Sequence, residues 1–365
     1  MSSSESVTLR ESRRIMEVCN ACRYCGGFCA VFPAMEKRRS FSGGELEYLA
    51  NLCHDCSDCF HACQYAPPHE FDLNVPKVMA ELRVQPYEKY VWPAPLGAFF
   101  RHNGRRVALL NVVSVAATLL LIFIFMGSDV FFSVHRGSGA FYRVVPYAAM
   151  VYVPLVMLLF SLSALGIGLA RFIRGMRWNP IRSVRPAHIM TAVRNLMILR
   201  YLGGGGDGCN DIDETFSHRR RWLHQTVFYG ALSCLVSTTV AAVYDHFLNR
   251  FAPYAPGSLP VVTGTLGGIA LVIGTGGLFW LKLRRDQRPT AVNLLGMDVV
   301  FQGQLFLVGL SGLLLLLLRE TAAMGVLLVV HLGLVAGLFL VLPYGKFIHS
   351  VYRFAALVRY AAEDR

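Results

Sequence analysis

The sequence is poor in charge: only 16% of its 365 residues are Asp, Glu, Lys or Arg, whereas 54% are hydrophobic. Soluble domains carry about 25% charged residues, so this composition excludes a simple soluble enzyme. The first 20 residues contain no apolar run of the kind that forms the core of a signal peptide, and we expect no cleaved leader. Acidic residues are also scarce, with 23 Asp and Glu against 35 Lys and Arg, and the positions of the charges decide what this excess means.

Uncharged apolar stretches alternate with basic segments. Six stretches are long enough to cross a bilayer as helices, which takes about 20 residues, and they lie at about 107–127, 147–170, 224–245, 259–281, 299–318 and 323–345. The segments that would share the side of the N-terminus hold 31 of the 35 Lys and Arg, and these are 1–106, 171–223, 282–298 and 346–365. This asymmetry follows the positive-inside rule and explains the net charge without nucleic acid. We therefore expect a multi-pass protein of the inner (cytoplasmic) membrane with both termini in the cytoplasm.

The strongest motif is a pair of cysteine runs. Both have the spacing C-x2-C-x2-C-x3-C, and together they comprise Cys19, Cys22, Cys25 and Cys29, then Cys53, Cys56, Cys59 and Cys63. In two-cluster ferredoxins, three thiolates of such a run hold one [4Fe-4S] cluster and the fourth holds the other. We therefore assign cluster 1 to Cys19, Cys22, Cys25 and Cys63, and cluster 2 to Cys53, Cys56, Cys59 and Cys29.

Zinc is the alternative occupant, because C-x2-C pairs also form tetrahedral zinc sites. Two complete runs at cubane spacing leave no ligand over, which favours iron-sulfur clusters, and reduced thiols are expected in the cytoplasm. Ala30 and Gln64 stand where a proline usually follows the fourth cysteine, but no ligand is lost.

The sequence around the cysteines has helical periodicity and no strand alternation. Leu46, Leu49 and Leu52 share one face of a predicted helix over 45–52, and a second amphipathic helix is predicted over 75–82. We predict an all-α fold: an α-helical ferredoxin-like domain with two [4Fe-4S] clusters over 1–100, then a six-helix membrane bundle over 101–365 with a long cytoplasmic loop at 171–223. That loop contains Gly203–Gly206 and Gly208 before Cys209; it lacks the Lys-Ser/Thr of a P-loop, and we expect a tightly turned or flexible loop, or a partner or quinone contact.

Histidines at the ends of the spans are candidate haem ligands. His224 and His349 lie at the cytoplasmic boundary, where an inner haem b would be held. His331, inside the sixth span, and His246, at the end of the third, are the candidates for an outer haem. His331 and His349 are 18 residues apart, about five helical turns, so on one continuous helix both would point from the same face. His218 is a reserve ligand on the inner side, and we expect the loop residues His102, His135 and His188 to be solvated.

Taken together, these features resemble the citrate/tricarballylate utilization protein B family. The resemblance is carried by the paired cysteine runs, GGGGDGC at 203–209, RRWLHQTVFYG at 220–230 and the six apolar blocks. It implies a membrane partner of a soluble FAD-dependent dehydrogenase, such as tricarballylate dehydrogenase, that reoxidises the reduced flavin and sends electrons to the quinone pool. The stretch 331–349 is also similar to the haem-bearing helix of the nitrate reductase gamma subunit, which implies His331 and His349 as ligands. RWLH at 221–224 likewise resembles the other ligand helix, but Cys234 stands where that helix would supply its second histidine.

The leading hypothesis is thus an electron-transfer protein that links a flavin dehydrogenase to quinone through two [4Fe-4S] clusters and haem b. One alternative is a carboxylate transporter with a redox-sensing iron-sulfur domain, although Asp245, Asp298 and Glu320 all lie at span ends. Another is a redox enzyme with its own chemistry at a cluster, but the eight cysteines leave no open iron, and no adjacent base marks Cys209 as reactive.

Overall fold

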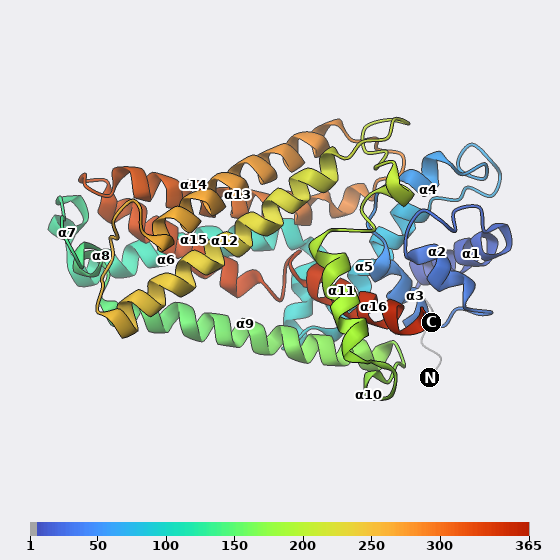
Figure 1. Cartoon of the computed structure of the whole chain (residues 1–365), viewed down its shortest axis with the longest axis horizontal. Coiled ribbons are helices and arrows are strands. Elements are labelled where there is room, and N and C mark those ends of the chain that lie inside the picture. Colours follow the sequence, from blue (N-terminus) through green and yellow to red (C-terminus); the bar gives the residue numbers. More distant parts are fainter. Residues whose placement is uncertain (1–5, 365) are drawn as a thin grey trace.

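The protein is elongated and helical throughout. The computed structural model describes residues 6–364, and that range contains no β-strand. Long helices occupy one end of the molecule and short helices occupy the other, where both described ends of the chain lie (Figure 1). The predicted all-α fold, with a small helical domain ahead of six long apolar helices, is confirmed.

Five helices surround the cysteine runs: α1 (Val7–Cys22), α2 (Val31–Glu36), α3 (Gly43–Leu52), α4 (Asp58–His61) and α5 (Val75–Tyr90). The predicted helices over 45–52 and 75–82 are parts of α3 and α5. Helix α3 begins with a capping box, in which Ser42 accepts from the backbone of Glu45 and the Glu45 carboxylate accepts from the backbone of Ser42. Leu46, Leu49 and Leu52 are fully buried, as their spacing predicts.

The six long helices are each apolar enough to cross a membrane. They are α6 (Asn103–Met126, preceded by η1, Ala94–His102), α9 (Tyr147–Gly175), α12 (Arg219–Leu248), α13 (Leu259–Arg284), α14 (Leu295–Leu318, preceded by η3, Val292–Leu294) and α15 (Met324–Val341). The connections contain α7 (Ser128–Phe132), α8 (Ala140–Val144), α10 (Pro180–Ser183), α11 (Pro186–Met197) and η2 (Gly204–Gly206), and the chain ends with α16 (Ile348–Glu363). Each predicted span overlaps one of these long helices.

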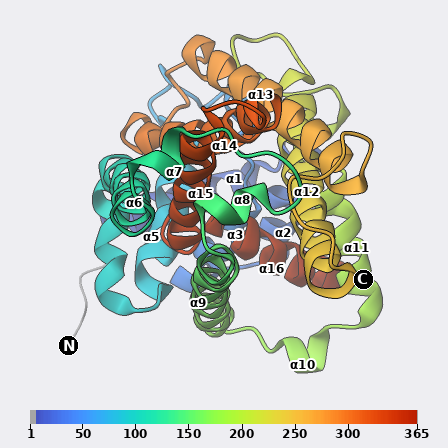
Figure 2. The ribbon, with the colours of Figure 1, turned by 90° about the vertical axis from the view of Figure 1, so that its left-hand side faces the viewer.

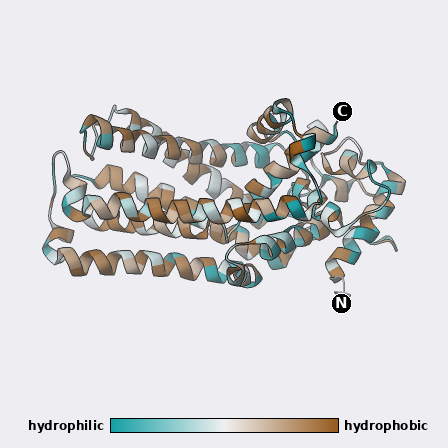
Figure 3. Ribbon diagram, turned by 90° about the horizontal axis from the view of Figure 1, so that it is seen from below, coloured by the Kyte–Doolittle hydropathy of each residue, from teal (hydrophilic) through white to brown (hydrophobic). Residues whose placement is uncertain are grey.

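The outer surface of the long helices is apolar. Ile124 is 64% exposed and Leu317 is 77% exposed, and hydrophobic residues cover the length of these helices in Figure 3. Soluble proteins rarely expose apolar surface on this scale, so we conclude that lipid covers it and that this is a multi-pass membrane protein. Helix α15 packs against α6, α9 and α14, and Figure 2 shows it between them.

The last predicted span differs from the structure. We expected a helix to 345 that continues in register to His349, but α15 ends at Val341 and α16 begins only at Ile348. Pro343 lies in the intervening turn, and proline ends a helix because it has no N–H and its ring clashes with the preceding turn. The expectation that one helix face relates His331 to His349 is therefore wrong.

The short helix α16 joins the membrane bundle to the N-terminal helices. Its Tyr352 is fully buried; the ring stacks on Phe172 of α9, with centroids 4.4 Å apart, and lies 5.5 Å from the Tyr87 ring of α5. One hydrophobic core thus extends across the predicted boundary at residue 100. The cysteine-bearing helices are held rigidly against the bundle because both contribute to this core.

The end of α16 is fixed by a charged contact. Arg38 donates to both carboxylate oxygens of Glu363, at 2.8 and 3.0 Å, and Arg359 donates to the same carboxylate at 2.8 Å. The guanidinium groups of Arg38 and Arg359 lie 4.9 and 4.4 Å from the ring centroid of Tyr48. Removing the carboxylate would leave two largely buried guanidinium groups without their partner.

We expect Glu363→Gln to destabilise the protein by about 2 kcal/mol, a typical loss for hydrogen bonds between charged groups. Thermal unfolding of the detergent-solubilised protein measures this as a lower midpoint. Glu320→Gln, an exposed change at the opposite end of the bundle, is the matched control. Equal midpoints for both variants would show that the Glu363 contact contributes nothing.

Candidate iron-sulfur and histidine site

Four cysteines from both runs line one enclosed cavity. Cys29 comes from the end of the first run, whereas Cys53, Cys56 and Cys59 come from the second. Cys53 follows the end of α3, and the other two lie just before and within the short helix α4. Cys53 and Cys56 are only 7% exposed. These four cysteines are the set that the spacing assigns to cluster 2.

The remaining four cysteines also lie together, nearer to solvent. Burial, and then the thiols of Cys25, Cys63 and Cys22, raise the pKa of Cys19 to about 12. Thiols that repel one another in this way become stable as thiolates when iron binds them, because the cation reverses the local electrostatics. Cys22 is exposed at the end of α1. The cysteines assigned to cluster 1 are therefore neighbours on the outer side of the domain.

The two candidate occupants need different arrangements of sulfur. A zinc ion needs four sulfurs about 2.3 Å from a single centre, whereas a cubane needs thiolates spread around a larger body. Within residues 6–364, no three His, Cys, Asp or Glu side chains are close enough to hold one metal ion. The four cysteines that line the cavity are the donor type that a cubane uses.

The glycine-rich loop covers the second run. Gly204, Gly205 and Gly208 have positive φ angles of 49°, 80° and 121°, so the prediction of a tightly turned loop is confirmed. A Cβ atom on Gly204 would lie 1.9 Å from Oδ2 of Asp58, so a side chain would not fit there. Cys209 is fully buried against Cys56, and the backbone N–H of Asn210 donates to Asp58 Oδ1 at 2.9 Å. The loop thereby shields this cavity from solvent.

Four arginines hold the backbone of the second run, and we call them the arginine clamp: Arg83 of α5, Arg220 of α12, Arg285 after α13 and Arg353 of α16. Arg83 and Arg353 both donate to the carbonyl of Cys53, at 2.7 and 2.6 Å. Arg220 donates to the carbonyl of His54 at 3.1 Å. Arg285 forms an ion pair with Asp55 at 2.7 Å and donates to its carbonyl at 3.0 Å. Three of the four arginines belong to the membrane part of the chain.

Histidines converge beside this loop. His224 of α12 interacts electrostatically with His349 of α16 and also with His54, which lies between Cys53 and Asp55. Burial, followed by Arg353 and Lys346, lowers the pKa of His349 well below its usual value, so its imidazole is neutral. Neutral imidazole is the form that ligates iron. The structure therefore brings together the two residues predicted for the inner haem.

Both rings have defined surroundings. His349 Nδ1 contacts the carbonyl of Lys346, the kind of contact that orients ligating histidines, and its Nε2 lies 3.5 Å from the Ser350 hydroxyl. Nδ1 of His224 is buried and has no hydrogen-bond partner within residues 6–364. Two neutral imidazoles have the donor chemistry of axial haem ligands.

The residues predicted for the outer haem contact different helices. His246 bonds to the hydroxyl of Tyr147 on α9 at 3.0 Å, and its Nδ1 contacts the carbonyl of Ala242 at 3.0 Å. His331 Nδ1 bonds to Ser311 of α14 at 2.9 Å. His246 is thus engaged by α9 and by its own helix, whereas His331 is engaged by α14.

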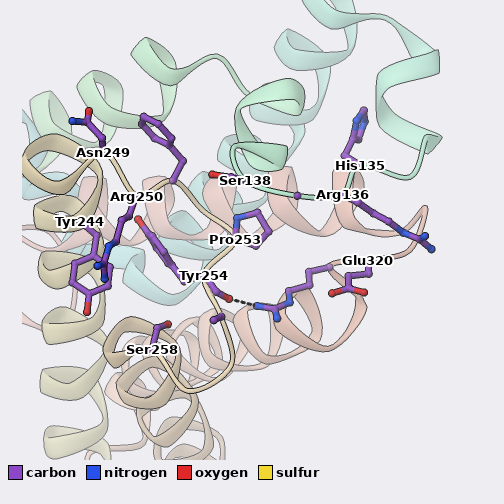
Figure 4. Close-up of a pocket in the computed structure, with 14 residues that line it drawn as sticks. His135, Arg136, Ser138, Tyr244, Asn249, Arg250, Pro253, Tyr254, Ser258 and Glu320 are labelled. Carbon is purple, nitrogen blue, oxygen red and sulfur yellow. Dashed lines mark hydrogen bonds between the residues drawn. The ribbon is translucent and has the colours of Figure 1, made fainter.

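A cavity of about 610 Å³ lies at the end of the bundle away from the cysteines. It is lined by His135, Arg136, Arg250, Arg319 and neighbouring loop residues (Figure 4). Arg319 donates to the carbonyl of Tyr254 at 2.7 Å, and Arg250 lies over the ring of Tyr244. Its lining contains none of the eight cysteines of the two runs and neither His224 nor His349.

The fold and these sites define a membrane protein with a ferredoxin-like domain. The family model described as citrate utilization protein B matches residues 101–365, and the model of its Fer4-like domain matches residues 12–89. The chain is 45% identical to citrate utilization protein B of Escherichia coli over 359 residues, which cover 97% of this chain and 92% of that protein. The chain therefore belongs to the citrate utilization protein B family. No solved structure matches it.

Several residues around the site were not predicted from the sequence. Arg220 was interpreted only as part of a cytoplasmic charge excess, and His54 was not considered at all. A signal was present for His54, because it lies inside the second cysteine run. The partners of Arg83, Arg285 and Arg353 lie far away in the sequence, so no local pattern could reveal them.

We expect Cys63→Ser to damage the cluster held mainly by Cys19, Cys22 and Cys25, because the fourth ligand of that cluster comes from the second run. Electron paramagnetic resonance (EPR) of the reduced protein, with iron analysis, measures the loss. Cys209→Ser, which changes a buried cysteine outside both sets, is the control and should retain both signals. Loss of only the signal that depends on Cys53, Cys56 and Cys59 would refute the crossed assignment.

Proposed function

We propose that the protein carries electrons from the reduced flavin of a soluble dehydrogenase to membrane quinone, with two [4Fe-4S] clusters and haem b as its one-electron carriers. The observation that carries this proposal is the junction between the two parts of the chain. There, His54 of the second run interacts electrostatically with His224, and Arg353, which follows His349 on α16, donates to the carbonyl of Cys53. One set of residues thus links the cysteine loop to the two histidines.

We propose that the flavoprotein binds at the surface around the first run. Cys22 is exposed, and nearby aromatic residues also reach solvent, with Tyr24 70% and Phe71 41% exposed. Exposed aromatic side chains are enriched at protein contacts. Cys53 and Cys56 of the second run are buried beneath the arginine clamp and the glycine-rich loop, whereas Cys22 of the first run is exposed, so cluster 1 is the one that a soluble partner would approach.

The distribution of charge supports an orientation in the inner membrane. The four basic segments, with 31 of the 35 Lys and Arg residues, lie at the same end of the bundle as the cysteine-bearing helices. The other four Lys or Arg residues lie at the opposite end, and they are Arg136, Arg143, Arg250 and Arg319. By the positive-inside rule, this asymmetry supports our proposal that the cysteine domain and both termini lie in the cytoplasm. A cytoplasmic dehydrogenase would then meet the exposed first run.

The name of the relative supports a role in the use of citrate or a related tricarboxylate. In our proposal the acid binds to the dehydrogenase, and this chain handles only electrons. The transporter alternative gains no support from Asp298. Asp298 is paired with Lys282 at 2.7 Å and with Lys346 at 2.6 Å, so its charge is already compensated by the protein.

The experiment that tests this function adds catalytically reduced flavoprotein partner to the oxidised, detergent-purified protein. We expect the iron-sulfur absorbance to bleach and the haem b bands to appear, and a quinone analogue should then reverse both changes. Clusters that stay oxidised would contradict the proposed electron transfer from flavin to this protein. Labelled citrate accumulating in vesicles that contain only this protein would favour the transporter instead.

The haem assignment has its own variants within that experiment. His224→Leu and His349→Leu should each remove the inner haem bands, because each replacement deletes an axial ligand. His102→Leu, a change in the connection before α6, is the matched control and should leave the spectrum unchanged. Retention of the bands in both ligand variants would assign these histidines to a structural or quinone-binding role.

A further inference from the structure

The two cysteine sets differ in their electrostatic surroundings. The clamp places four guanidinium groups around the loop 53–57, and only Asp55 and Asp211 oppose them in ion pairs, with Arg285 and Arg220 respectively. Within residues 6–364, Arg83 and Arg353 form no ion pair; the hydrogen bonds of both end on backbone carbonyls. Arg353 is 7% exposed and Arg83 is 6% exposed. The second run thus lies in a buried environment where four guanidinium groups face the three carboxylates of Asp55, Asp58 and Asp211.

The first run lacks such an environment. Arg23, inside the run, is exposed and donates to the carbonyl of Asn20 at 2.9 Å, and Arg14 of α1 is paired with Glu11 at 2.6 Å. The carboxylate of Glu36 lies on this side, 3.1 Å from the Cβ position of Gly26, and Cys22 is exposed to water. Charges near the first run are therefore balanced by a carboxylate or screened by water, whereas Arg83 and Arg353 beside the second run are buried and have no ion-pair partner within residues 6–364.

A buried positive charge favours the reduced form of a nearby carrier. Each electron adds one negative charge, and the interaction of that charge with a guanidinium is strong where water is excluded. Hydrogen bonds to sulfur are present in both sets, from the backbone of Asp55 to Cys53 Sγ at 3.4 Å and from the backbone of Tyr65 and Ala66 to Cys63, so the buried guanidinium groups are what distinguish the two sets.

We propose that the arginine clamp holds the reduction potential of cluster 2 above that of cluster 1, so that electrons pass from cluster 1 toward the membrane. This inference rests on the proposed function, because it needs both clusters. In the step concerned, cluster 1 loses one electron and cluster 2 gains it; the reduced flavin supplies the electron, and no proton moves. Arg220, Arg285 and Arg353 come from the membrane part, so the docking of the two parts sets this order. The arginines act as positioning residues.

The experiment is a redox titration of the full-length protein in detergent, followed by EPR. The signal lost in Cys63→Ser identifies cluster 1. In the unchanged protein we expect cluster 2 to be reduced first. Arg353→Gln should lower its reduction equilibrium constant at least tenfold, equivalent to 59 mV for one electron, whereas Arg353→Lys should largely restore it. Arg101→Gln, which breaks a surface pair with Glu88, is the control.

A second variant, which should shift the potential of cluster 2 in the opposite direction, keeps the inference testable if Arg353→Gln does not fold. Asp55→Asn removes a negative charge beside the second run and keeps an oxygen to accept from Arg285, so it should raise the potential of cluster 2 and leave cluster 1 unchanged. If the Arg353→Gln protein loses its clusters, the reduction potential of cluster 2 in Asp55→Asn tests the inference in its place. Cluster 1 titrating first, or an unmoved cluster 2 potential in Asp55→Asn, would overturn the inference. Absence of two clusters from the unchanged protein would instead refute the proposed function.

Discussion

The structure depends on how the backbone of the loop 53–57 is satisfied. Two cysteines of the cluster 2 set lie in this loop, which has no regular secondary structure to use its carbonyl groups. Buried carbonyls without partners would be costly, and the arginine clamp supplies donors from four separate helices and connections. The membrane helices therefore complete the iron-sulfur domain, and neither part has a finished interior alone.

This constraint explains the position of the last helix. Pro343 ends α15 near the inner end of the bundle, and the chain turns so that α16 lies against α3, α9 and α11. Helix α16 brings Arg353 to Cys53 and His349 to His224, and its far end is held by Arg38. One short helix thus contributes to the shared core, the clamp and the candidate haem site. A continuous sixth span would have supplied none of these.

The sequence was sufficient for the features encoded in local pattern. The apolar stretches predicted six long helices, and the assignment of the eight cysteines to two clusters stays a prediction. The leucine spacing at 46–52 predicted a buried helix face. Prediction failed where distant residues decide the outcome: the turn at Pro343 was treated as part of a helix, and the role of Arg353 depends on a carbonyl 300 positions away. The buried position of Cys209 likewise depends on a loop that packs across the chain.

The central claim is that the paired runs hold two iron-sulfur clusters at a junction with haem. Iron, sulfide, zinc and haem assays on anaerobically purified protein, with a reduced-minus-oxidised optical spectrum, test it most directly. We predict about eight non-haem iron and eight sulfide per chain together with haem b bands, as two [4Fe-4S] clusters and a haem require. About two zinc per chain with no sulfide would contradict the account.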